Sequence, residues 1–148
     1  MVKFKGTFWV EGIPKPGGSK TVFPCKGKKG KYVVVDACKG NKKWRESVAA
    51  QVRKSYHGEP LTTPLCVDFY FYMPRPKCHY TAKGKLKPNA PAYHTVKPDK
   101  GKLERSTTDA LTGILWKDDA QIVTGTTEKN YVSDTKESPS CLIRLEEI

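Results

Sequence analysis

Three aspartates have the residue type best suited to chemistry, and they flank one predicted helix. Asp99 lies just before this helix in KPDKGKL, and Asp118 and Asp119 lie just after it in WKDDAQI. Carboxylates that meet in one place can hold a divalent metal ion. A helix of about 15 residues is ~22 Å long, so its two ends form one site only if other parts of the fold, or a second subunit, bring them together. The alternative is that Asp118 and Asp119 make only a polar turn between helix and strand.

The elements that must position these aspartates follow from the hydrophobic pattern. Strands are predicted over 2–10, 21–23, 31–36, 65–73, 120–128 and 140–147, and helices over 41–56 and 102–116. Asn41 is expected to cap the first helix. Residues 74–101 are basic and contain five prolines, which predicts a long exposed loop, and such a loop is usually functional or disordered. The order predicts one α+β domain over 1–148, ferredoxin-like, with a mixed β-sheet and two helices packed on one face.

The charge of the chain is unevenly distributed. Residues 1–102 hold 22 basic and 6 acidic side chains, whereas residues 103–148 hold 5 basic and 9 acidic ones. The basic residues cluster in Gly- and Pro-rich stretches that carry or adjoin aromatic rings, a combination typical of proteins that bind nucleic acid. A plain solvated surface is the alternative. The expected DNA contacts are Lys15, Lys20, Arg75, Lys97, Lys100 and Lys102.

The composition excludes several other classes of protein. Among the 148 residues, 37% are hydrophobic, which is too many for a fully disordered chain. No apolar run approaches the ~18 residues that a membrane span needs, and the start of the sequence lacks the pattern of a signal peptide. The five cysteines are scattered without a C-x-x-C pair, so a zinc ribbon is not expected. We therefore expect a cytoplasmic protein in a reducing compartment, without a membrane partner.

A longer pattern runs through residues 94–123, which read HTVKPDKGKLERSTTDALTGILWKDDAQIV. This run resembles the signature of the RusA-type Holliday junction resolvases, approximately K/R-P-D-x-D-N/K-L-x-K/R, then D-A-L-T-G, then W-x-D-D-A-Q-V/I. The stretch VEGIPKPGGSK at 10–20 and the helix that begins around Trp44 are also similar to that family. The combination of DALTG with WKDDAQI is improbable by chance, so the resemblance in this half is specific.

The resemblance implies a homodimeric endonuclease that uses Mg²⁺, or Mn²⁺ in its place. Its substrate would be four-way junctions or other branched DNA, which it resolves by paired symmetric nicks in recombination and repair. A bacterial cell, with the gene in a phage or prophage, would be its setting. Catalytic roles fall on Asp99, Asp119 and Arg105, and metal ligation on Asp99, Asp119 and Asp118. Carboxylates are hard ligands for Mg²⁺, and Arg105, where the family usually has Lys, is a fixed cation that acts electrostatically.

One position departs from the family pattern. The second aspartate of the K-P-D-x-D motif is Gly101 here, and glycine offers no ligand. Asp118, Asp109 or a water molecule would have to fill the gap, although Asp109 can equally pair with Arg105 at i, i+4. The alternative function is therefore a protein that binds junctions with impaired or no cleavage. A generic binder of single strands or RNA explains the charge, but it leaves the W-x-D-D-A-Q-I run unexplained.

Overall fold

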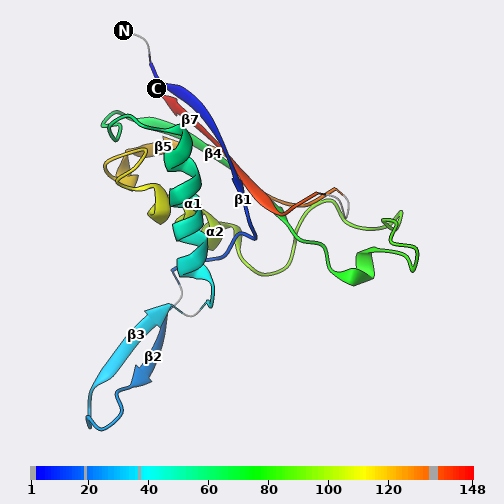
Figure 1. Cartoon of the computed structure of the whole chain (residues 1–148), viewed down its shortest axis with the longest axis horizontal. Coiled ribbons are helices and arrows are strands. Elements are labelled where there is room, and N and C mark those ends of the chain that lie inside the picture. The colour runs from blue at the N-terminus through cyan, green and yellow to red at the C-terminus, as the bar shows by residue number, and fades with distance from the viewer. Residues whose placement is uncertain (1–2, 19, 37, 134–136) are drawn as a thin grey trace.

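The computed structural model describes residues 3–18, 20–36, 38–133 and 137–148. Its centre is a five-stranded mixed sheet (Figure 1) with the order β1-β7-β4-β5, in which β6 also pairs with β4. Strand β7 is antiparallel to β1 and to β4, whereas β5 and β6 are parallel to β4. The strands are β1 (Lys5–Glu11), β4 (Leu65–Met73), β5 (Ile122–Thr124), β6 (Thr127–Tyr131) and β7 (Ser140–Glu147). The predicted α+β class is confirmed.

Two helices, α1 (Asn41–Ser55) and α2 (Lys100–Leu111), cover one face of this sheet (Figure 1). Every second residue of β4 is buried, so one face of the strand packs into the core. From α1, the buried side chains of Trp44, Val48 and Val52 recur every four residues and meet that face. The buried Leu103 and Leu111 do the same from α2. The core between helices and sheet fixes where α2 lies.

Helix α1 and the strands at 65–73 and 140–147 match the predicted ranges within one residue. The first strand begins at Lys5, and residue 2 of the predicted strand lies outside the described residues. The prediction for Asn41 as a cap is wrong, because Gly40 holds that position with φ 90°. Asn41 is buried instead, and its Nδ2 donates a hydrogen bond to the carbonyl oxygen of Pro16. This contact ties the segment before β2 to α1.

Helix α2 is shorter than predicted and begins earlier. It starts at Lys100, so the basic loop spans 74–99, and a 3-10 turn, η1 (Lys77–His79), lies within it. The helix ends at Leu111 because the chain reverses at Gly113, whose φ is +90°, a value that favours glycine. The Gly113 N–H donates to the carbonyl of Trp116 at 2.7 Å, which closes the reversal. The chain therefore turns back toward α2 instead of continuing away from it.

The strand predicted over 120–128 is divided into three elements. A 3-10 turn, η2 (Asp119–Gln121), precedes β5, and Gly125 separates β5 from β6. Gly125 has φ +148°, and a Cβ atom there would lie 1.8 Å from the carbonyl oxygen of Val67. The single predicted strand is therefore wrong, because the chain must pass so close to β4 that only glycine fits.

The loop 74–99 returns along the outer edge of β6. The His94 N–H donates to the Lys129 carbonyl at 3.1 Å, and the Tyr131 N–H donates to the Ala92 carbonyl at 2.9 Å. Arg75 braces the loop from within, because its Nη1 donates to the carbonyl oxygen of Pro91 and its guanidinium lies 5.1 Å from the Tyr131 ring centroid. The loop is thus fastened to the sheet at both of its ends.

Strands β2 (Lys20–Pro24) and β3 (Tyr32–Asp36) form a separate antiparallel ribbon, as the sequence predicts. The ribbon projects away from the sheet and helices (Figure 1). In the part of the chain that the structure describes, no helix is long and apolar enough to cross a membrane.

Candidate active site

A shallow concavity of about 190 Å³ lies where one face of α2 meets the start of η2. Five of its lining residues come from α2 at spacings of three and four, which places them on one side of the helix. The sixth, Asp119, arrives through the reversal at Gly113. The full lining is Gly101, Glu104, Arg105, Thr108, Asp109 and Asp119. Of the predicted catalytic residues, Arg105 and Asp119 therefore share one surface.

Asp99 lies apart from that lining, at the residue that precedes α2. Its carboxylate is exposed, and its Oδ2 is 3.9 Å from the Lys102 Nζ. Lys129, on β6, donates to the carbonyl oxygens of Val96 and Pro98, each at 2.8 Å, and so holds the segment just before Asp99. Burial lowers the pKa of Lys129, and the negative charge of Asp99 opposes that shift. Asp99 thus stands near a partly buried cation, about one and a half turns before Glu104 and Arg105.

Asp118 and Asp119 have different surroundings although they are adjacent. The Asp118 Oδ1 accepts a hydrogen bond from the Ala120 N–H at 2.9 Å, and the Asp118 N–H donates to the Gln121 side chain at 2.7 Å. This reciprocal arrangement is a capping box, so Asp118 makes the polar turn that the sequence allowed. Only Asp119 of the pair lines the concavity.

Glu104 is a charged residue of this site to which sequence reasoning gave no role. It lies one helical turn after Gly101, and its Oε2 accepts a hydrogen bond from the Thr127 hydroxyl at 2.9 Å. Thr127 opens β6, so the sheet edge fixes the direction of this carboxylate. The helical period counted from Gly101 could have identified Glu104, since residues three apart share a face. Among the ion pairs of the described residues, none joins Arg105 to Asp109.

The oxygen ligands of the concavity suit Mg²⁺ chemically. Glu104, Asp109 and Asp119 supply hard carboxylate oxygens, and Mg²⁺ is usually bound by one or two carboxylates plus waters and substrate phosphates. Within the ranges that the structure describes, no group of three His, Cys, Asp or Glu residues is arranged to hold a metal. The site therefore fits an open arrangement of one or two protein carboxylates, not a closed metal cage.

Gly101 faces open space in the first turn of α2, because a Cβ atom there would meet nothing within 4 Å. Replacing Gly101 by Ala is expected to raise the free energy of unfolding by about 0.4–1 kcal/mol, since alanine restricts the unfolded chain and fits the helix. Urea denaturation followed by circular dichroism measures this change. The matched control is Gly113→Ala, also in open space but at φ +90°, which is expected to destabilise by about 1 kcal/mol or more. Equal effects of the two substitutions would contradict the helical geometry at Gly101.

The predicted DNA contacts occupy three different places. Lys97, Lys100 and Lys102 surround the start of α2, beside the candidate site. Lys15 and Lys20 lie in the segment that leads into the β2–β3 ribbon and at its first residue. Arg75 is half-buried, and it braces the loop 74–99 by donating to the carbonyl oxygen of Val132 and contacting His79.

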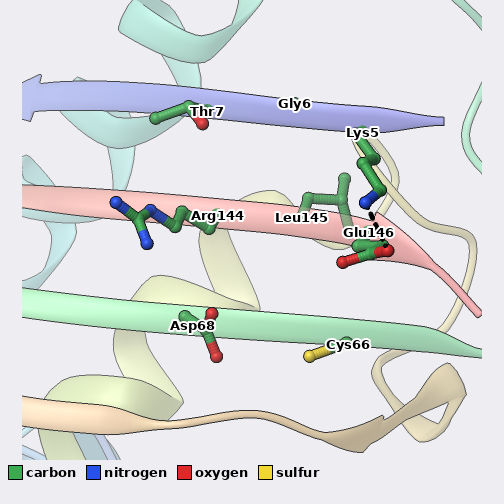
Figure 2. A pocket seen from close by; sticks show the side chains of 8 residues that line it. All are labelled: Lys5, Gly6, Thr7, Cys66, Asp68, Arg144, Leu145 and Glu146. Carbon is green, nitrogen blue, oxygen red and sulfur yellow. Dashed lines mark ion pairs between the residues drawn. The ribbon is translucent and has the colours of Figure 1, made fainter.

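A second concavity, of about 350 Å³, lies on the opposite, helix-free face of the sheet (Figure 2). Its side chains come from β1, β4 and β7, and Lys5 pairs with Glu146 at 2.9 Å. Asp68 points into it beside Arg144, and the Asp68 Oδ1 accepts from the Thr126 N–H at 2.8 Å. Charges on this face therefore compensate one another, and the face is separated by the sheet from Arg105 and Asp119.

Carboxylates and an arginine around one open concavity, on a chain of net charge +12, are the features of an enzyme that works on nucleic-acid phosphates. A model of the endodeoxyribonuclease RusA family matches residues 21–144. The chain therefore belongs to the RusA endodeoxyribonuclease family, which resolves Holliday junctions and acts on branched DNA. No curated protein matches the chain. The family match includes residues 94–123 and so confirms the resemblance seen there, and it extends over most of the sequence.

Proposed function

We propose that this protein is a Mg²⁺-dependent endonuclease that cuts four-way DNA junctions by paired symmetric nicks. The observation that carries the proposal is the concavity on α2, where Arg105 and Asp119 meet in a chain of the RusA family. The resemblance alone placed catalytic roles on these two residues, and the fold brings them to one surface although 14 positions separate them along the chain.

The residues of the concavity have separable tasks in this proposal. Asp119 and Glu104 would hold Mg²⁺, and the Thr127 hydroxyl keeps the Glu104 carboxylate oriented toward the site. Bound Mg²⁺ supplies polarisation of the phosphate and a lowered pKa for a coordinated water. The guanidinium of Arg105 would attract the phosphate and stabilise the charge that grows during cleavage. Asp99 lies about one and a half turns before Arg105 and would join the metal ligands when DNA is bound.

A homodimer completes the proposal because a four-way junction needs two symmetric cuts. A dimer with two-fold symmetry supplies two equivalent sites. Phosphates are read by lysines without regard to sequence, so the geometry of the junction across the two sites would determine which DNA is cut. Lys97, Lys100 and Lys102, around the start of α2, would hold the phosphates on either side of the cut.

The test is incubation of the protein with a synthetic four-way junction, in Mg²⁺ or in EDTA, with a linear duplex of the same length as control. Paired nicks in opposite strands of the junction, lost in EDTA and absent from the duplex, are the expected result. Equal cutting of junction and duplex would overturn the proposed selectivity, and cutting in EDTA would overturn the metal dependence.

A second candidate function, junction binding with little or no cleavage, is favoured by Gly101, which removes one ligand of the family motif. Since a Cβ atom at Gly101 meets open space, Gly101→Asp introduces the missing carboxylate without a clash. If the natural chain binds junctions but leaves them intact, nicking by Gly101→Asp and not by the isosteric Gly101→Asn would establish this second function. If the natural chain already nicks, the second function is excluded.

A further inference from the structure

The β2–β3 ribbon with its connecting turn, residues 20–36, forms a projecting arm (Figure 1). We call these residues the arm, with a stem made by the two strands and a tip at 25–31. At the tip, Gly27 and Gly30 have φ of 74° and 79°, and a Cβ atom at either would meet nothing within 4 Å. The tip is therefore an open turn with its side chains directed to solvent.

The arm is strongly basic, with five lysines and a single acidic residue, Asp36, at its last position. No carboxylate occurs between Glu11 and Asp36, whereas this stretch holds six lysines. Four of them, Lys26, Lys28, Lys29 and Lys31, belong to the tip, and all four are exposed. A tip that carries four like charges with no acidic neighbour repels itself in water, so it favours a polyanionic partner. Such a partner would release counterions on binding.

The stem exposes apolar side chains on both of its faces. The strand register pairs Val22 with Val34 and Phe23 with Val33, and successive pairs point to opposite faces. Between 48% and 65% of the surface of each of five side chains is exposed, namely Val22, Phe23, Tyr32, Val33 and Val34. An isolated two-stranded hairpin is only marginally stable in water. We therefore expect a partner to cover the exposed apolar side chains of the stem.

The root of the arm lies against the candidate active site. The Gly17 N–H donates to the carbonyl of Lys102 at 2.9 Å, and the Ser106 hydroxyl donates to the carbonyl of Lys15. A Cβ atom at Gly18 would lie 2.9 Å from the Cδ of Arg105. DNA held by Arg105 must therefore pass beside the point where the arm begins.

We propose that the arm is a DNA clamp that holds the duplex next to the cleaved phosphate. The tip lysines contact phosphates, and the stem enters a groove. There Phe23 and Tyr32, on opposite faces of the ribbon, lie against the sugars and base edges that border the groove. A two-stranded ribbon fits the major groove of DNA. The inference rests on the proposed function only in taking DNA as substrate. The run of lysines favours DNA over a second copy of this chain, which itself carries net charge +12.

The test compares two double substitutions that remove the same charge. Lys28→Gln/Lys29→Gln alters the tip, and Arg53→Gln/Lys54→Gln alters the exposed end of α1 as the control. Binding to a linear duplex and to a four-way junction is measured by fluorescence anisotropy in Ca²⁺ between 50 and 200 mM salt. Each lost phosphate contact flattens the log–log salt slope by about 0.9. From the lowest to the highest salt concentration, the fold-loss of affinity is therefore expected to be ~12 times smaller for the tip variant than for the parent chain. The control variant is expected to lose affinity as the parent chain does.

A third variant, Phe23→Ser/Tyr32→Ser, tests the stem and is expected to weaken binding about tenfold, because the apolar contact of both rings with the groove is lost, while the salt slope stays unchanged. Equal salt slopes for the tip variant and the parent chain would overturn the clamp. A lower sedimentation mass of the stem variant, with unaltered DNA affinity, would assign the stem to a second copy instead. Nicking assays remain separate: a clamp without nicking contradicts only the proposed function, and nicking without these binding changes contradicts only the clamp.

Discussion

Asp119→Asn is expected to lower the rate of junction nicking by at least about a hundredfold, with junction binding in Ca²⁺ unchanged within about twofold. The asparagine keeps the shape of the side chain but removes the negative charge that would hold Mg²⁺ in the concavity. Single-turnover cleavage of a labelled four-way junction measures the rate, and isothermal titration with Mn²⁺ measures metal binding independently of activity. Weaker Mn²⁺ binding by Asp119→Asn is the second expected result.

The matched control is Asp118→Asn, one residue earlier in the chain. The Asp118 Oδ1 accepts a hydrogen bond from the Ala120 N–H, and an asparagine oxygen can accept the same bond. We therefore expect Asp118→Asn to keep both its fold and most of its nicking rate. Equal loss of nicking in the two variants would show that both aspartates serve the metal. Full activity of Asp119→Asn would remove the concavity on α2 from the mechanism.

Gly125→Ala is expected to produce the largest loss of stability, roughly 4 kcal/mol or more. The new Cβ atom would lie 1.8 Å from the Val67 carbonyl oxygen and 2.7 Å from its carbon, so relief requires movement of the backbone of β4. The φ of +148° adds strain for any residue with a side chain. Urea denaturation, or the yield of soluble folded protein where the variant does not fold, measures the loss.

Gly84→Ala serves as the control for Gly125→Ala. Gly84 also has a positive φ, of +78°, but a Cβ atom there would meet nothing within 4 Å. This control isolates the cost of backbone strain, which is about 1–3 kcal/mol. If both substitutions destabilise the protein equally, the close passage of the chain over β4 does not contribute, and the division between β5 and β6 needs another explanation.

The sequence predicted the elements whose hydrophobic period is undisturbed. Helix α1 repeats its buried residues every four positions, and β4 alternates buried and half-buried residues along its whole length. The two largest errors of extent, the end of α2 and the single strand over 120–128, fall at glycines. The φ of a glycine cannot be predicted from sequence, because glycine adopts positive and negative φ about equally well. The reversal at Gly113 and the close approach of Gly125 to β4 therefore become visible only in the folded structure.

The candidate site was predictable in composition but not in arrangement. The resemblance at 94–123 singled out Asp99, Arg105 and Asp119, and the concavity unites the last two but not Asp99. The different surroundings of Asp118 and Asp119 could not be predicted from sequence, because a capping box and a metal ligand use the same residue type. Glu104 escaped notice because its orientation depends on Thr127, which lies 23 positions later and meets it only through the pairing of β6 with β4.

The return of the loop 74–99 along β6 also protects this edge strand from pairing with strands of other chains. An uncovered strand at the border of a sheet offers unpaired backbone groups on which other chains can assemble. Here Ala92 and His94 occupy those groups of β6. Basic, proline-rich sequence on the outside of this cover is itself a poor template for further strands. Shortening the loop would therefore expose the unpaired backbone groups of the edge strand β6 and favour aggregation, even if every residue of the concavity were kept.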